Sequence, residues 1–183
     1  MAWGDHLCLF YKSTAELRQL LTHYFQTGLA DGECCVWITS PSLTEGDALE
    51  ALQLSMPQIR GYLGTGQLEI LPYTQWYVDN GKFRSDAILA SWLTKLHNAT
   101  RRGFAGLRVA GDASWLSSRE QRHEFIAYEQ KVTDAVSAQR ILALCTYPSA
   151  GWIPEEMLQV MQCHGSVLLP SSGGWKAIDI GRS

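Results

Sequence analysis

Two kinds of apolar pattern alternate along the chain. Short runs that are almost continuously apolar, such as CCVWITS and ILALC, are separated by longer stretches in which apolar residues recur every three or four positions. The short runs indicate buried strands, and the longer stretches indicate helices with one apolar face. The expected strands are 6–11, 34–40, 68–73, 106–111, 140–147 and 166–169, and the expected helices are one between Ser13 and Asp31, then 43–55, 57–64, 86–102, 118–138 and 154–163.

Helices that alternate with such strands are typical of a mostly parallel sheet. The sequence therefore predicts an α/β fold in three layers, with helices on both faces of the sheet, in a single domain over residues 1–183. Ligands of such sheets bind beyond the carboxyl ends of the strands, where we expect a site. The tail SSGGWKAIDIGRS is rich in Gly and Ser and then apolar, which favours an added edge strand or hairpin.

Composition excludes several classes of partner. Acidic residues outnumber basic ones by 18 to 15, so we expect no direct contact with nucleic acid. The apolar runs are too short to span a membrane and the first residues lack the order of a signal peptide, so we expect a cytoplasmic protein without membrane contact. The five cysteines form no CxxC pair, which favours reduced thiols over disulfides.

Two motifs suggest nucleotide chemistry only in part. Lys12 and Ser13 open a helix after a strand, as at the end of a phosphate-binding loop, but the glycines of that loop are missing. We therefore interpret Ser13 as a helix cap and expect neither tight binding nor hydrolysis of ATP. Asp112 follows the strand GLRVAG as a magnesium-binding acid does. Without a phosphate loop, we expect its side chain to cap the following turn or to contact a ligand.

Two charged residues interrupt apolar patterns. Arg108 lies in the middle of a strand, and Glu129 falls in the helical stripe that should face the sheet. Because a buried charge is costly unless it is paired, we predict that the two meet directly or through one water or ligand group. A structural ion pair and a ligand-binding pair both fit this pattern.

Soft side chains share faces of two strands. The period of two places His6, Cys8 and Phe10 on one face of the first strand, and Cys145 and Tyr147 on one face of strand 140–147. If the strands are neighbours, these side chains line one pocket. A small apolar compound would gain there from polarizable sulfur and aromatic rings.

The same residue types leave a metal site open as an alternative. His6, Cys8, Cys145 and His164 offer imidazole and thiolate ligands for zinc or another transition metal. Their spacing matches no common structural zinc pattern, and cysteine is also a common core residue. Pocket lining therefore remains the first interpretation, without a cofactor.

Aromatic residues follow two of the expected strands. Trp76 and Tyr77 come after strand 68–73, and Trp115 comes after strand 106–111. Rings at strand ends can wall a cavity, or they can pack as an ordinary rim.

Several short segments together resemble the MEDS domain, the methanogen/methylotroph DcmR sensory domain. The resemblance covers about residues 5–169. It is carried by HLCLFY, GLADGE before CVWITS, GQLEIL, Trp76–Tyr77, GLRVAGDASW, Tyr128–Glu129 and ALCTYP. It implies a RecA/KaiC-like fold without a working phosphate loop.

The resemblance also implies a function, namely a non-enzymatic sensory domain for a small hydrocarbon derivative in prokaryotic signal transduction or transcription regulation. The positions that match the family's motifs are His6, Cys8, Arg108, Asp112, Trp115, Glu129, Cys145 and Tyr147. With Phe10 and Trp76 they form the expected ligand-binding set. The alternatives are a Cys/His metal or redox sensor and, less favoured, a degenerate nucleotide-binding protein. Since the 183 residues contain no DNA-binding or kinase module, we expect output through a separate signalling protein, unless the sequence is a truncated part of a longer chain; self-association is left open.

Overall fold

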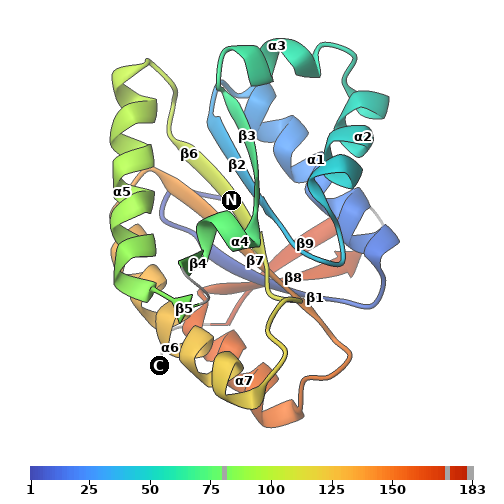
Figure 1. The fold of residues 1–183 in the computed structure, drawn as a ribbon, viewed down its shortest axis with the longest axis vertical. Coiled ribbons are helices and arrows are strands. Elements are labelled where there is room, and N and C mark those ends of the chain that lie inside the picture. Colours follow the sequence, from blue (N-terminus) through green and yellow to red (C-terminus); the bar gives the residue numbers. More distant parts are fainter. Residues whose placement is uncertain (80–81, 172–173, 181–183) are drawn as a thin grey trace.

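A seven-stranded sheet forms the centre of the computed structural model, which describes residues 1–79, 82–171 and 174–180. Its strands are β1 (His6–Tyr11), β2 (Cys34–Thr39), β3 (Leu68–Pro72), β6 (Leu107–Asp112), β7 (Ile141–Pro148), β8 (Ser166–Ser171) and β9 (Gly174–Asp179). They lie in the order β3-β2-β6-β7-β1-β8-β9, and only β9 is antiparallel to its neighbour. The predicted three-layer α/β fold and the hairpin near the carboxyl end, formed by β8 and β9, are therefore confirmed (Figure 1).

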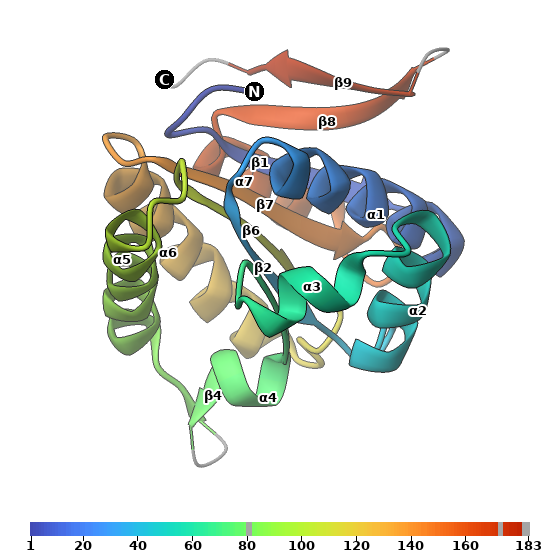
Figure 2. The ribbon, with the colours of Figure 1, turned by 90° about the horizontal axis from the view of Figure 1, so that it is seen from above.

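Helices cover both faces of this sheet. One layer contains α1 (Thr14–Ala30), α2 (Glu45–Ser55) and α3 (Ile59–Gly64), and the opposite layer contains α5 (Ser85–Arg101), α6 (Arg119–Val136) and α7 (Pro154–Cys163). Figure 2 shows α1, α2 and α3 on one side of the strands and α5 and α6 on the other. Each layer buries its own core cluster, so the sheet separates two apolar interiors.

Local sequence explains where the helices begin. Ser13 caps α1 by accepting a hydrogen bond from the Glu16 amide at 3.2 Å. Capping boxes begin α2 at Thr44 and α6 at Ser118. Such caps satisfy amide groups that have no partner within the helix, and α7 instead begins with Pro154, whose missing N–H costs nothing there.

One segment was not predicted. After β3, a single helical turn, α4 (Tyr73–Trp76), leads into a two-stranded ribbon of β4 (Val78–Asp79) and β5 (Lys82–Phe83). These elements are too short to give a periodic signal. Aromatic contacts hold this segment to the rest of the protein. The ring of Tyr77, for example, stacks on Trp115 with ring centroids 5.5 Å apart.

No helix within the described ranges combines the length and the apolar character that crossing a membrane requires.

Candidate functional site

The predicted meeting of Arg108 and Glu129 is wrong, because they lie on opposite faces of the sheet. Arg108 faces α1, where its guanidinium lies 4.6 Å from the Tyr24 ring. Glu129 lies on α6, in the other layer. Side chains alternate between the two faces of a strand, so Arg108 and Leu107 point to opposite faces. The sequence does not show which helical layer covers each face.

Arg108 pairs instead with Glu33, which precedes β2. The Arg108 Nε donates to Glu33 Oε2 at 2.5 Å and Nη2 donates to Oε1 at 3.1 Å, so the pair is bidentate. Arg108 and Glu33 are 3% and 4% exposed. A side-chain carbon added to Gly28 would lie 2.4 Å from Arg108 Nε, so glycine in α1 gives the guanidinium its space. This pair is structural and lies away from the soft residues.

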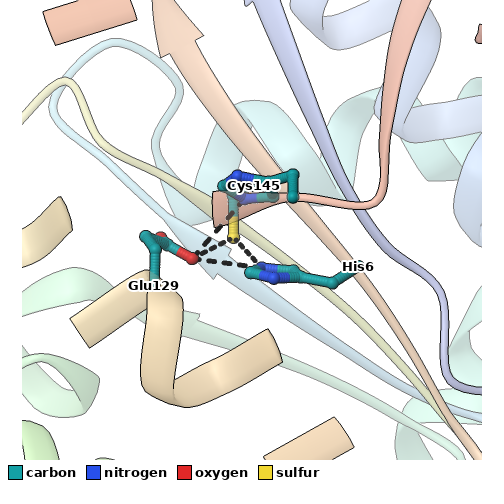
Figure 3. A group of neighbouring side chains, drawn as sticks. His6, Glu129 and Cys145 are labelled. Carbon is teal, nitrogen blue, oxygen red and sulfur yellow. Dashed lines mark hydrogen bonds and ion pairs between the residues drawn. The ribbon is translucent and has the colours of Figure 1, made fainter. Parts of the chain in front are cut away.

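Glu129 belongs to a different polar cluster, formed with His6, Cys145 and His164 in the core below α6. The His6 Nε2 atom lies 3.1 Å from Glu129 Oε2 and 3.3 Å from Cys145 Sγ. Cys145 Sγ lies 3.3 Å from the same carboxylate oxygen, and His164 Nε2 lies 3.6 Å from it. Figure 3 shows His6 from β1, Glu129 from α6 and Cys145 from β7 pointing toward one another. We call these four residues the His-Glu-Cys cluster.

Neighbouring groups fix the two imidazoles from behind. His6 Nδ1 lies 2.6 Å from the Thr133 hydroxyl, and His164 Nδ1 lies 2.7 Å from the Val160 carbonyl. The two rings stand 4.0 Å apart between centroids. His164 immediately follows α7, and the buried Glu156 ties this helix to α6 by accepting from Arg122 Nε at 3.2 Å. Tertiary contacts therefore position both rings.

Burial controls the protonation of the cluster. It raises the pKa of Glu129 above its ordinary value, and it lowers the pKa of His164 to about 3, helped by the neighbouring His6. It also raises the pKa of Cys145 well above its ordinary value, with the Glu129 carboxylate adding to the effect. The cluster therefore favours a neutral thiol over a thiolate nucleophile.

A small apolar void borders the cluster. It has a volume of about 10 Å³, which is room for about one water. Cys145, which is only half-buried, lines this void together with residues of β6, β7, α5 and α6. The lining residues include Trp92, Gly111, Tyr128, Val132 and Ala143, together with Tyr77, which follows α4. The thiol thus connects the polar cluster to an apolar, aromatic space.

The other residues predicted on the first strand share this face. His6 and Cys8 are 2% and 0% exposed, and Cys8 pairs in register with Cys145, which confirms that the two strands are neighbours. Cys8 does not belong to the His-Glu-Cys cluster. Glu129, rather than Cys8, contributes an atom to the group of four that converge. Phe10 packs on the buried ring of Tyr147, with 5.4 Å between centroids. The face predicted from the period of two is therefore present, but its polar centre includes Glu129.

Three predicted residues lie elsewhere, near the carboxyl ends of the strands. Trp76 packs on Trp92, with ring centroids 4.3 Å apart, and Trp115 stacks on Tyr77. Asp112 ends β6, where its carboxylate accepts from the Ser114 amide at 2.9 Å and from the Thr146 hydroxyl at 3.0 Å. Asp112 therefore caps the turn, as one of the two interpretations predicts. The polar cluster lies farther back, beneath α6, rather than beyond the strand ends where we expected the site.

The turn between β1 and α1 contains only Lys12 and Ser13. Lys12 is exposed, and its amide donates to Glu16 Oε2 at 2.8 Å. A phosphate-binding loop needs several backbone amides that are free to surround a phosphate. This short turn does not provide them.

Sequence reasoning missed Glu33 and Thr133 as partners. Glu33 lies in a turn without a periodic signal, and Thr133 occupies an ordinary position of a helix. Their roles depend on side chains more than 70 residues away along the chain, the separations being 75 for Glu33 and Arg108 and 127 for His6 and Thr133.

The fold and the missing phosphate loop define a class, the RecA-like α/β domains that lack a nucleotide cradle. Two solved structures with this fold are a KaiC-like protein of Pyrococcus horikoshii (14% identity, TM-score 0.61, covering 97% of this chain and 77% of that one) and the flagellar accessory protein FlaH of Methanocaldococcus jannaschii (14%, TM-score 0.59, covering 100% and 80%). At this identity the likeness concerns the fold alone.

Residues 5–165 match the family described as MEDS, the MEthanogen/methylotroph, DcmR Sensory domain. The chain belongs to this family, as the sequence motifs predicted. It is similar to the transcriptional repressor DcmR of Methylorubrum extorquens (strain DSM 6343 / CIP 106787 / DM4), with 25% identity over 167 residues. The match covers 90% of this chain and 59% of the repressor, so the chain spans less than two thirds of that relative. Membership and this relative support a sensory or regulatory role.

Proposed function

We propose that this chain is a non-enzymatic sensory domain of prokaryotic signal transduction or transcription regulation, and that its input is a small hydrocarbon derivative bound beside Cys145. The observation that carries the proposal is the apolar void of about 10 Å³ that borders the His-Glu-Cys cluster. An apolar wall with a polar group at one end suits a small molecule that has one polar atom.

The size of the void suggests how binding is transmitted. A compound larger than water fits only if lining side chains move, so the bound and the free conformations differ. A ligand that binds one conformation better shifts the population toward it. Trp92, whose indole donates to the Tyr128 hydroxyl at 3.0 Å, links the lining residues of α5 and α6. Movement here would change the outer surface of these helices, where a change could be passed on.

The protonation of the cluster supports a role in binding rather than catalysis. Catalysis by a cysteine needs a thiolate, which an adjacent base or cation provides. Burial and the nearby carboxylate raise the pKa of Cys145 instead.

Filling the void tests this proposal. Methanol, ethanol, ethylamine and chloroform serve as probes, and their binding is measured by thermal shift and calorimetry. A probe whose free concentration is 100 times its Kd raises the free energy of unfolding by about 2.7 kcal/mol. We expect at least one of them to stabilise the wild-type protein and Ala143→Val to abolish this effect. Ala110→Val is the matched control, because Ala110 is equally buried on β6 but faces the other layer. Absence of any shift, or equal loss in both variants, would contradict the effector site.

A further inference from the structure

Hydrogen bonds at Nδ1 determine which nitrogen of each histidine faces the centre of the His-Glu-Cys cluster. The Thr133 hydroxyl donates its hydrogen to the Cys163 carbonyl, so its oxygen must accept from His6 Nδ1–H. The Val160 carbonyl can only accept, so His164 Nδ1 also carries a hydrogen. With a hydrogen on Nδ1 in both rings, Nε2 is the nitrogen of each ring that faces the centre of the cluster and is placed to bind a metal ion there.

Both Nε2 atoms face the same carboxylate oxygen. Glu129 Oε2 lies 3.1 Å from His6 Nε2 and 3.6 Å from His164 Nε2. The buried His164 Nε2 has no hydrogen-bond donor facing it, and its residue is 1% exposed. A metal ion at this point would give the buried His164 Nε2 a partner and would lie within reach of the neighbouring nitrogen, sulfur and oxygen atoms.

We infer that His6, Glu129, Cys145 and His164 bind one divalent transition-metal ion of the zinc type. Their four ligand atoms all lie within 4.8 Å of one another. In a tetrahedral zinc site with bonds of about 2.0 to 2.3 Å, neighbouring ligand atoms lie about 3.3 to 3.7 Å apart. The observed separations of 3.1, 3.3, 3.3 and 3.6 Å between these ligand atoms are close to this geometry.

The donor set selects the class of metal. Two imidazoles and a thiolate favour zinc and similar transition metals over magnesium and calcium, which prefer oxygen ligands. Binding removes the thiol proton, and the thiolate and the carboxylate then balance a divalent charge inside the core. The Nδ1 contacts to Thr133 and Val160 are the outer-shell hydrogen bonds that orient metal-bound histidines.

The metal would join parts of the chain that are far apart. His6 begins β1, Glu129 lies in α6, Cys145 lies in β7, and His164 connects α7 to β8. Occupancy would therefore stabilise the contact between the sheet and the α6–α7 layer. This inference goes beyond the proposed effector site and does not depend on it.

Metal titration of the chelator-treated protein tests the inference. We expect one Zn²⁺ per chain by elemental analysis, a raised Tm, and no effect of Mg²⁺. Co²⁺ should give a thiolate charge-transfer band in the near ultraviolet. Loss of an outer-shell partner typically weakens affinity ~10–100-fold. We therefore expect that range for Thr133→Val, and a loss of at least ~100-fold for Cys145→Ser or His164→Gln.

Cys35→Ser is the matched control, since Cys35 is a buried thiol in the other layer, and it should bind Zn²⁺ like the wild type. The inference is overturned if the wild type binds no Zn²⁺ at micromolar concentration, or if Cys145→Ser keeps the Co²⁺ band. If the ligand variants do not fold, absence of the band in the wild type still overturns it. Zinc binding without any probe effect would reject only the effector proposal, and a probe effect without zinc binding would reject only the metal site.

Discussion

Replacing Glu33 by alanine is expected to lower the free energy of unfolding by about 3 to 5 kcal/mol. Glu33 provides the carboxylate of the bidentate contact to Arg108, and both side chains are buried. Without it, the guanidinium remains beside the Tyr24 ring in a low-dielectric core and loses the carboxylate that pairs with its charge. Urea denaturation followed by circular dichroism measures the loss.

Two further variants test whether the loss of stability comes from the unpaired Arg108 charge rather than from mutation in general. The double variant Glu33→Leu with Arg108→Met removes both charges, so it should regain most of the lost stability. Asp86→Ala breaks the exposed pair with Lys131 at 2.9 Å and should have a far smaller effect, because water screens exposed charges. Wild-type stability in the Glu33→Ala protein would show that Arg108 does not depend on this carboxylate.

Replacing Phe125 by alanine is expected to cost about 3 to 5 kcal/mol. Phe125 of α6 is 2% exposed and packs against four rings. Its centroid lies 5.5 Å from Tyr77, 5.6 Å from Phe83, 5.8 Å from Trp115 and 5.4 Å from Tyr128. Removing it leaves a cavity between α6 and the segment that contains α4 and the β4–β5 ribbon, because the surrounding rings cannot close the space fully.

The measurement is again urea denaturation, together with hydrogen exchange at Tyr77 and Phe83. The backbone amides of Tyr77 and Phe83 should exchange faster in Phe125→Ala, because the rings of both residues lose their contact with Phe125. Phe104→Ala is the control, since Phe104 is only half-buried and should cost much less. Equal losses in the two variants, or unchanged exchange, would contradict a central role for Phe125.

Periodicity predicted most of the fold, and the reason is local. The apolar runs of β2 and β7 and the helical spacing in α1 and α6 each need only neighbouring residues to be recognised. The cap at Ser13 is equally local. The segment with α4 and the β4–β5 ribbon was missed, because two-residue strands have no period and are held by rings contributed from other elements.

The sequence by itself determined that His6 shares a strand face with Cys8 and Phe10, that Glu129 interrupts an apolar stripe, and that the β1–α1 turn lacks the glycines of a phosphate loop. Only the tertiary structure decided which charges meet. Strand order and the layer that each face contacts placed Arg108 against Glu33 and brought Glu129 to His6, Cys145 and His164. A period of two defines two faces but does not say which helices cover each, and contacts between residues 75 or 127 positions apart arise only when the sheet assembles.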